Sequence, residues 1–389
     1  MFACDVLRLL EACGSYALFQ RSFRVKKEVI LGLALFTPSA PPLFGLDIST
    51  TAVKLVELSA HGRRGYKLER FALEPLPPQA VVDGGIQQVS EVVAAVKRAV
   101  QQTGTRLRHV AMGVPASAVI TKKIITPANL DASALAFHVE NEADQYIPFA
   151  LEEVHLDYQV LPHQPTHPEG TQEVLIAATQ KSHVDERVEV ADSAGLKAVV
   201  VDMESFAQQA ALLHAMQMDH AMPNDESWVC IEIGANAMEL SVMRHGEVIF
   251  TRQHLLGGQT LTAEMQKRYG LSRKDAEQAK RNLNPADDVA GVLAAFIQHV
   301  VLEVQRALQF FQASVDDARI QQVMLFGGSS VLPGLQEAIA ERVGVGALLV
   351  DPFAMMALAP RLKRLPIAEV APGLVLACGL ALRRFDAFR

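Results

Sequence analysis

"FGLDISTTAVKLVEL", Phe44 to Leu58, joins an apolar run to a short polar turn and a second apolar run. The polar residues of this stretch are, in chain order, Asp47, Ser49, Thr50, Thr51 and Lys54. Asp, Ser and Thr are common turn residues, and a lysine on an outgoing strand is usually solvated, so an ordinary hairpin explains the pattern. A binding turn explains it equally well, because one short motif has a high rate of false matches. The rest of the chain has to decide between the two interpretations.

Length and composition limit the classes of protein that come into question. The chain has 389 residues, of which 50% are hydrophobic, which predicts a globular protein long enough for two domains. Its net charge of −7 and pI near 6.0 provide no basic surface for nucleic acid. The four cysteines show neither metal-ligand spacing nor a disulfide framework, which favours a reducing cytoplasm; they are Cys4, Cys13, Cys230 and Cys378.

Residues 1–42 read as a poorly specified leader that ends in the Pro-rich linker "TPSAPP". Its apolar run "VILGLALF" has eight residues, far short of the roughly 20 that a membrane helix needs. The run also begins more than twenty residues into the chain, which does not suit a standard secretory signal. We therefore expect a cytoplasmic protein without direct membrane insertion.

The strand–turn–strand pattern around Asp47 occurs twice in the chain. "LDISTTAVKLVELSAHGRRGYKLERFAL" is echoed by "IEIGANAMELSVMRHGEVIFTRQHLLGG", so that Asp47 aligns with Glu232 at an offset of 232 − 47 = 185 residues. Each copy reads as strand, polar turn, strand, Gly-containing turn and strand, an antiparallel meander. The repeat predicts two similar domains, which would bring their acidic turns together across a cleft.

A third turn follows late in the chain. "QQVMLFGGSSVLPGLQEAIAERVG" predicts a buried strand over 323–326, a Gly-Gly-Ser-Ser turn, and a helix that starts near Pro333. Glycines beside a helix N-terminus suit an anion or a nucleotide, although a strand–helix corner needs them for geometry alone. The sequence contains neither a Walker A motif nor a GxGxxG motif, which argues against a P-loop or Rossmann nucleotide site.

Together, the Asp-x-x-Thr-x-x-x-Lys pattern, the second acidic turn and the late Gly-Gly-Ser turn resemble the actin-like ATPase superfamily. Within it, the chain from about Leu43 to Phe385 resembles the PilM family of type IV pilus assembly proteins, relatives of the cell-division protein FtsA. "ENEADQYIPFALEEVHLDYQVL", "GGQTLTAEMQKRYGLSRKDAEQAK" and "CGLALRRFD" are similar to that family in order and spacing. The resemblance implies an α/β fold of two duplicated ribonuclease H-like domains with an inserted small α/β (SHS2-like) subdomain.

The resemblance also implies domain boundaries. The first actin-like domain would comprise residues 43–116 and 197–222, the inserted association subdomain 117–196, and the second actin-like domain 223–389. The inserted segment itself reads as strand, helix, strand, strand, helix, interrupted by the polar loop "LPHQPTHPEG". Two histidines in that loop are better explained as solvated side chains than as metal ligands.

ATP or ADP with Mg²⁺ is the ligand that the resemblance implies. Asp47 would hold Mg²⁺ through water, since this cation keeps several waters and takes few carboxylates. The first turn would bind phosphate oxygens and Lys54 would supply a positive charge. Glu277 and Lys280, three residues apart on one helix face, would contact ribose and base, and they also suit an intrahelical ion pair. The implied nucleotide-binding residues are Asp47, Ser49, Thr50, Thr51, Lys54, Gly234, Asn236, Gly257, Gly258, Glu277, Lys280, Gly327, Gly328 and Ser329.

Two acids carry the implied catalytic roles. Glu204, at a strand-to-helix turn, occupies the place of the residue that orients the attacking water in similar filament proteins, although the helix dipole also favours an acid there. Glu232 replaces the aspartate that is usual in the second turn, and Ala235 and Ala237 replace residues that could contact phosphate. A displacement of about 1 Å can reduce a rate about a hundredfold. We therefore expect nucleotide binding with weak or absent hydrolysis.

The partner that the resemblance implies is the cytoplasmic N-terminal tail of an inner-membrane PilN-type protein, bound in a groove beside the inserted subdomain. Other pilus assembly components and self-association are further expectations. The apolar stripe in "VLAAFIQHVVLEVQRALQFFQAS" predicts a helix that packs on the second-domain sheet, with a filament contact as the second interpretation.

Three classes of function stay open: an ATP-binding scaffold, an FtsA-like membrane-tethering filament protein or cycling ATPase, and a small-molecule kinase. The kinase would need a catalytic aspartate, for which Asp202 is the candidate.

Overall fold

A computed structural model describes residues 41–62, 65–161, 168–217, 226–281, 290–315 and 319–386. The predicted leader up to residue 40 and the two loop histidines therefore lie outside the described residues. The chain divides into two compact units. Unit 1 takes in the described residues up to Ser59, Glu69–Ala210 and the C-terminal segment from Leu376, and unit 2 takes in Ala60–Leu68 and Ala211–Val375.

The first sheet is built around β1 and has the strand order β10-β6-β1-β2-β3-β16. β1 pairs antiparallel with β2 and parallel with β6, and β6 pairs parallel with β10. All six residues of β1 are buried, as expected for a central strand covered on both faces. The strands are β1 (Leu43–Ile48), β2 (Ala52–His61), β3 (Gly65–Pro75), β6 (His109–Val114), β10 (Lys197–Met203) and β16 (Ala357–Leu358).

Helices cover both faces of this sheet in unit 1. Phe44 and Val110 pack with apolar residues of α2 (Val89–Thr103) and α4 (Lys181–Ser193) on one face. Leu43 and Ala111 pack on the other face with α5 (Glu204–Gln217) and α10 (Val375–Leu382). Gly45 permits the close approach of α10, because a Cβ at this position would lie 2.1 Å from a backbone oxygen of that helix.

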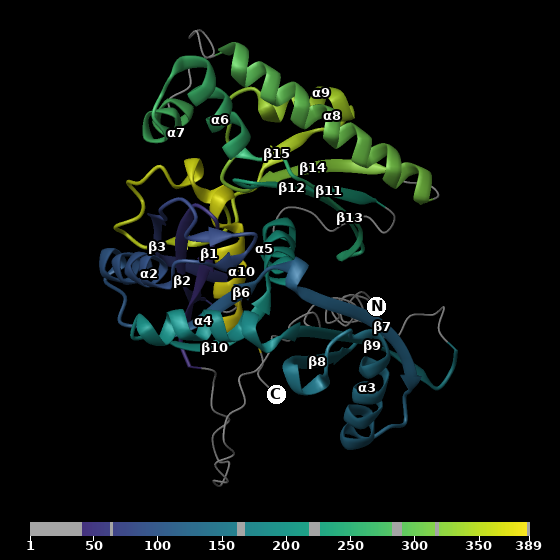
Figure 1. The fold of residues 1–389 in the computed structure, drawn as a ribbon. Helices are drawn as coiled ribbons and strands as arrows, with labels where there is room; N and C mark the ends of the chain where they lie inside the picture. The colour runs from purple at the N-terminus through teal and green to yellow at the C-terminus, as the bar shows by residue number, and fades with distance from the viewer. Residues whose placement is uncertain are drawn as a thin grey trace, which may run out of the picture. The chain divides into compact units, whose positions relative to one another are not determined.

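The second sheet, in unit 2, repeats the pattern with the order β13-β12-β11-β14-β15. β11 pairs antiparallel with β12 and parallel with β14, and β14 pairs parallel with β15, as β1 does with β2 and β6, and β6 with β10. The sequence repeat is thus also a structural repeat, in which β10, β6, β1, β2 and β3 of the six-stranded first sheet correspond to the five strands of the second (Figure 1). The strands are β11 (Ser227–Ile233), β12 (Met238–Arg244), β13 (Glu247–His254), β14 (Ile320–Phe326) and β15 (Ala347–Leu349).

The helices of unit 2 supply its core. The apolar side of the long helix α8 contributes Phe296, Val300 and Phe311 to a cluster with β11, β12 and β14. Among the described residues, Gly291–Ser314 is long and apolar enough to cross a membrane. Its packing in this cluster confirms the predicted core helix. The helices are α6 (Gly258–Tyr269), α7 (Arg273–Arg281), α8 (Ala290–Ser314) and α9 (Leu335–Val343), and in Figure 1 α8 and α9 lie together.

A small α/β module interrupts unit 1 between β6 and β10. Its sheet has the order β7-β9-β8, and α3 packs on it through Leu135 and Val139. The elements are β7 (Val119–Pro127), α3 (Ala132–Tyr146), β8 (Val154–Val160) and β9 (Thr171–Gln180), followed by α4. The predicted order of strand, helix, strand, strand and helix is confirmed for this segment.

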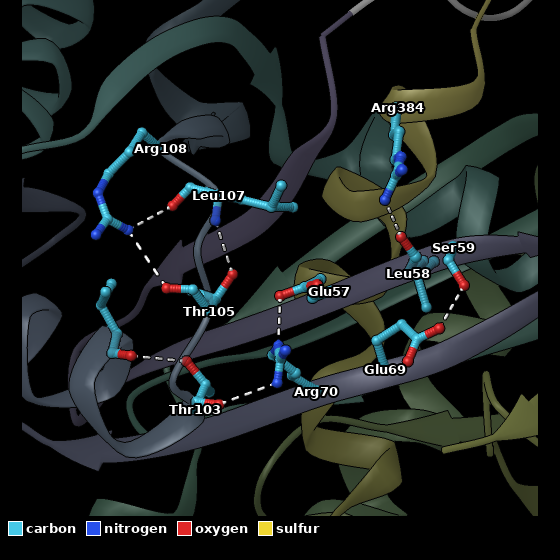
Figure 2. Close-up of polar contacts among 11 residues, drawn as sticks. Glu57, Leu58, Ser59, Glu69, Arg70, Thr103, Thr105, Leu107, Arg108 and Arg384 are labelled. Carbon is cyan, nitrogen blue, oxygen red and sulfur yellow. Dashed lines mark hydrogen bonds and ion pairs between the residues drawn. The ribbon is translucent and has the colours of Figure 1, made fainter.

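Polar contacts tie the strands of unit 1 to their surroundings (Figure 2). Arg70 on β3 forms an ion pair with Glu57 on β2 at 3.0 Å and donates to the Thr103 carbonyl oxygen at 3.3 Å. Arg384 donates to the Leu58 carbonyl oxygen at 2.6 Å. The C-terminal segment is thus held on unit 1 by a hydrogen bond and by the apolar packing of α10. The division expected from the sequence assigns this segment to the second domain, and the domain boundaries stay a prediction.

Candidate functional site

The first turn holds a buried carboxylate beside a lysine. Asp47 and Lys54 are register partners on β1 and β2, and Lys54 Nζ donates to Asp47 Oδ2 at 2.9 Å. Asp47 is 2% exposed, whereas the Lys54 side chain is 16% exposed. Asp47 Oδ1 is buried and accepts no hydrogen bond from the part of the chain that the structure describes. A buried carboxylate oxygen without a donor is costly, so this atom is suited to a ligand such as a hydrated cation.

The hydroxyl residues of this turn differ in their roles. Ser49 closes the turn, because its backbone N–H and its Oγ both donate to the Ala52 carbonyl oxygen, at 3.0 and 2.9 Å. Thr50 and Thr51 are half-buried, and their hydroxyls make no hydrogen bond within the described residues. These two hydroxyls are therefore free to donate to an incoming oxygen, whereas the Ser49 hydroxyl already donates within the turn.

In unit 2, three separate loops meet at the end of β11. The Gly234 carbonyl oxygen accepts from the Gly258 N–H and from Ser329 Oγ, both at 3.0 Å. A Cβ at Gly258 would lie 2.2 Å from Ser329 Oγ and 3.3 Å from Lys280 Nζ, and a Cβ at Gly257 would lie 2.4 Å from the Ala235 oxygen. A Cβ at Gly257 would therefore clash with the backbone, whereas a Cβ at Gly258 would require the Ser329 side chain to move. The structure brings together predicted residues that lie as much as 95 positions apart.

Lys280 connects this cluster to α7. Its Nζ donates to Glu277 Oε1 at 2.9 Å, to Thr262 Oγ1 at 3.0 Å and to the Gly258 oxygen at 3.3 Å. Thr262 donates to Glu277 Oε1 at 2.6 Å. Burial alone would raise the pKa of Glu277, but the hydrogen bonds from Lys280 and Thr262 lower it overall. The predicted ion pair between Glu277 and Lys280 is thus present, and both side chains are held in fixed positions.

Thr262 was missed by sequence reasoning. It is fully buried on α6, and its hydroxyl has the Gly258 carbonyl oxygen, four residues earlier, as a second possible acceptor at 2.9 Å for its single proton. Its signal in the sequence is weak, because a threonine in a helix often bonds back to the preceding turn.

The Gly-Gly-Ser turn follows β14 as predicted. Gly327 has φ +92°, and a Cβ there would lie 2.6 Å from the Ile233 carbonyl oxygen, so the turn packs directly on the end of β11. Gly328 is exposed, and a Cβ there would meet no atom within 4 Å. Gly327 is therefore required by the local backbone, whereas Gly328 leaves open space that a ligand could use. The expected helix begins at Leu335, two residues after Pro333.

The second acidic turn differs from the first in the charge that faces it. Glu232 and Glu239 are register partners on β11 and β12, in the places that Asp47 and Lys54 take in the repeat. Burial and the neighbouring Glu232 charge raise the pKa of Glu239 to about 7. The sequence contains this signal, because 54 + 185 = 239 places Glu239 opposite Lys54 in the repeat. The second turn therefore has a glutamate at the register position where the first has a lysine.

Glu204 begins α5 directly after β10, as predicted from the sequence. Its Cγ would lie 2.8 Å from a Cβ at Gly113, the register partner of Asp202 at the end of β6. The buried Arg187 donates to the Gly113 oxygen at 3.2 Å and to the Gly84 oxygen at 2.5 Å. Burial lowers the pKa of Arg187, and the charge of Glu204 opposes this shift, which indicates that the two side chains interact.

Asp202 lies in a buried ion pair. It is 1% exposed, and its Oδ2 accepts from Arg383 Nε at 2.6 Å. Arg383, itself 1% exposed, also donates to Asp386 at 3.3 Å. An aspartate in a buried ion pair holds structure together, so the kinase interpretation loses its candidate base.

Taken unit by unit, the residues suit a nucleotide with Mg²⁺. In unit 1, Asp47 Oδ1 and the hydroxyls of Thr50 and Thr51 provide oxygen chemistry for a hydrated cation and phosphate. In unit 2, the Gly258 cradle and the Lys280 side chain offer backbone access and positive charge. Asn236 is exposed beside this cluster. The assignment of these residues to a nucleotide stays a prediction.

Comparison with protein families shows one match that spans most of the chain. A family described as type IV pilus assembly protein PilM matches residues 45–385. The chain is 22% identical over 361 residues to the cell division protein FtsA of Streptococcus pneumoniae serotype 2 (strain D39 / NCTC 7466), which covers 79% of this chain and 75% of FtsA.

Solved structures agree with this comparison. A PilM-PilN type IV pilus biogenesis complex contains a chain that is 27% identical, with a TM-score of 0.75, covering 90% of this chain and all of that one. The ethanolamine utilization protein EutJ from Carboxydothermus hydrogenoformans is 16% identical with a TM-score of 0.50, covering 88% of this chain and 92% of EutJ, a likeness of fold alone. The predicted actin-like α/β fold is confirmed by these matches together with the repeated sheet.

Proposed function

The chain belongs to the PilM family of type IV pilus assembly proteins, and from this premise we propose that it is a cytoplasmic, ATP-binding scaffold of pilus biogenesis. In this role it docks the cytoplasmic N-terminal tail of a PilN-type inner-membrane protein and reaches the membrane through that partner. The observation that carries the proposal is the likeness to a chain of a PilM-PilN complex over 90% of the present chain, at a TM-score of 0.75.

The inserted module supports a role in association. Large apolar side chains are exposed on it, and these can contact a partner. They are Ile125 (54% exposed), Phe137 (68%), Tyr146 (46%), Phe149 (39%) and Val160 (37%). Lys122 lies over the Tyr146 ring at 4.7 Å. We assign the tail-binding surface to this module, residues 117–196, and the nucleotide to the actin-like parts.

The nucleotide proposal rests on the buried Asp47 carboxylate and the glycine cradle. Asp47 would hold hydrated Mg²⁺, and Thr50, Thr51 and Lys54 would contact phosphate. Gly234, Gly257, Gly258, Gly327, Gly328 and Ser329 would admit the nucleotide close to the backbone, and Glu277 with Lys280 would contact the adenosine. Mg²⁺ supplies charge neutralisation of the phosphates when it is bound. The bound nucleotide would stabilise the partner-binding form of the scaffold.

The partner is tested with a synthetic peptide that carries the N-terminal tail of the PilN-type protein from the same genome. Calorimetry should detect saturable binding, with none for a scrambled peptide. Ile125→Ser and Phe137→Ser should weaken it at least fivefold, because both side chains are more than half exposed and can be changed without loss of the fold. Leu348→Ser, an exposed apolar change in unit 2, is the matched control. If the tail binds but neither variant weakens it, the surface assignment is wrong; if no tail peptide binds, the scaffold proposal fails.

The nucleotide is tested separately by thermal unfolding. Mg·ATP should raise the melting temperature, since a ligand that binds the native state stabilises it by mass action. Asp47→Asn keeps the size of the side chain and should remove the Mg²⁺-dependent part of the shift. Glu91→Gln, an exposed change on α2, is the control. An Asp47→Asn protein with the full Mg²⁺-dependent shift would contradict the assignment.

The same protein samples also test the FtsA-like alternative, by sedimentation and by binding to lipid vesicles. Nucleotide-dependent filaments that sediment, or that bind lipid vesicles without the partner, would favour a membrane-tethering filament protein over the scaffold.

A further inference from the structure

A hollow of about 480 Å³ lies on unit 2, and its lining includes none of the residues proposed for nucleotide. It lies between β13 and the side of α8 that does not enter the core, and its lining is Arg252, His254, Glu303, Arg306, Gln309, Phe310 and Ala313. Its volume is in the usual range for ligand pockets, so it can accept a few side chains of a partner.

β13 is an edge strand whose segment from Phe250 to His254 is regular. Among the described strands it pairs only with β12. Edge strands usually avoid pairing through proline, lysine or bulges, because their unpaired N–H and C=O groups attract another strand. β13, "EVIFTRQH", has no proline or lysine. Its register with β12 shifts at Ile249, where Val248 and Ile249 are 42% and 41% exposed, and the pairing from Phe250 to His254 is regular. This edge has the properties of a site for strand addition.

The hollow combines an exposed aromatic ring with positive charge. Phe310 is 57% exposed, and the Arg252 guanidinium lies 4.3 Å from its ring centroid. Arg306 Nη1 is 2.5 Å from Glu303 Oε1, and its side chain is 58% exposed. The lining contains one carboxylate, that of Glu303, and two guanidinium groups, those of Arg252 and Arg306. An occupant that carries a carboxylate complements this charge.

His254 contributes a buried polar atom that has no hydrogen-bond partner among the described residues. Its Nδ1 lies 3.0 Å from Glu303 Oε2, and its Nε2 is buried without a hydrogen-bond partner among the described residues. Burial lowers the pKa of His254, and the charge of Glu303 opposes this shift. An unpartnered buried polar atom is unfavourable, and an occupant of the hollow could satisfy it.

We propose that the groove between β13 and α8 docks an extended acidic segment of a partner protein, which adds as a strand to the edge of β13. Alternate side chains of an added strand point to one face of the sheet. On the α8 side, an acidic side chain of the segment meets Arg252 and Arg306, and an apolar one packs on Phe310. The backbone of the segment pairs with β13.

The test uses a fluorescein-labelled eight-residue peptide of alternating glutamate and valine with one central phenylalanine, measured by fluorescence anisotropy on the full chain. The expected result is saturable binding that is at least tenfold weaker for the same peptide with lysine in place of glutamate. N-methylation of alternate backbone nitrogens, tried in both registers, should abolish binding in one register at least, since it removes strand hydrogen bonds.

Two exposed substitutions locate the site. Arg306→Glu and Phe310→Ala should each weaken binding at least fivefold. Lys267→Glu on α6, with the same change of charge, and Leu302→Ala, an exposed apolar residue of α8 outside the lining, should leave it unchanged. Equal binding of the acidic and basic peptides, no binding of either below 1 mM (roughly the weakest useful affinity), or unchanged binding in both groove variants would overturn the proposal. Concentration-dependent dimerisation that is lost in Arg306→Glu would assign the groove to a second copy of this chain instead.

Discussion

Lys54 is the ion-pair partner of the buried Asp47 carboxylate in unit 1. The pair is joined at 2.9 Å, and Asp47 is 2% exposed. Removal of one partner of a buried ion pair leaves an uncompensated charge, which typically costs 3–5 kcal/mol. Because Lys54 is itself 16% exposed, we expect Lys54→Met to lower the free energy of unfolding by about 2–3 kcal/mol, measured by denaturant titration.

The same titration of the double variant Asp47→Asn with Lys54→Met separates charge from packing. If the cost of Lys54→Met arises from the isolated carboxylate, the double variant should recover at least half of it. Lys97→Met, on the exposed side of α2, is the control for loss of a lysine. A double variant as unstable as Lys54→Met would show that the lysine acts through its other contacts.

Glu239 should make stability depend on pH. Its pKa is raised to about 7 by burial and by Glu232, whereas an ordinary glutamate has a pKa of 4.5. Between these values the folded protein holds a proton that the unfolded chain releases, so this residue's contribution to stability is lost as the pH rises through the window. Relative to wild type, Glu239→Gln should therefore be more stable by on the order of 1–3 kcal/mol at pH 8.5, with the difference shrinking toward pH 5.

The measurement is thermal or denaturant unfolding of both proteins at the two pH values. Glu264→Gln, an exposed change on α6, is the control for loss of one carboxylate. A Glu239→Gln gain that is the same at both pH values would show that the substitution acts through packing and not through the proton.

At the scale of elements, the start of α6 sets how closely a ligand can approach the backbone. A methyl group at Gly258 would lie 2.2 Å from Ser329 Oγ and 3.3 Å from Lys280 Nζ. We expect Gly258→Ala to displace Ser329, to destabilise the protein by about 1–3 kcal/mol and to reduce the nucleotide-dependent rise in melting temperature. Gly291→Ala, on α8, meets no atom within 4 Å and should be neutral or slightly stabilising. If Gly258→Ala and Gly291→Ala changed stability and the nucleotide-dependent rise in melting temperature equally, the close contacts at Gly258 would not be what limits the approach of a ligand.

Helices and strands could be predicted where the hydrophobic pattern of a segment and its turn residues indicate the same element. The inserted module and the two meanders follow from alternation and turn residues, and β7, α3, β8 and β9 lie where the sequence predicts them. Contacts between segments that lie far apart in the chain could not be predicted from local sequence patterns. The fixed orientation of Lys280 depends on Thr262, 18 residues away on another helix. Leu376 and Leu380 pack with Leu43 and so join the two ends of the described chain. The periodicity of apolar residues within one segment does not reveal such a contact.

For the whole molecule, the two halves of the repeat differ in a way that bears on turnover. The first half pairs an acid with a lysine, Asp47 with Lys54, and the second pairs an acid with an acid, Glu232 with Glu239. Phosphoryl transfer needs positive charge and hydrogen-bond donors aimed at the phosphates. The second turn brings a longer carboxylate and lacks hydroxyls, since Ala235 and Ala237 flank Asn236. Binding can depend on the first turn and on the cradle, whereas catalysis would need both turns.

We therefore expect Mg·ATP to stabilise the protein while single-turnover cleavage stays near background. Glu232→Asp shortens the carboxylate by one methylene and should raise any cleavage that exists, because a displacement near 1 Å can cost about a hundredfold in rate. Binding of the PilN-type tail peptide should change little in this variant. Glu204→Ala should leave negligible cleavage negligible, and Gln208→Ala, on the same helix, is its control for damage to α5. Brisk wild-type cleavage that disappears in Glu204→Ala but persists in Gln208→Ala would establish a cycling ATPase, because only a competent active site depends in this way on the acid at the start of α5.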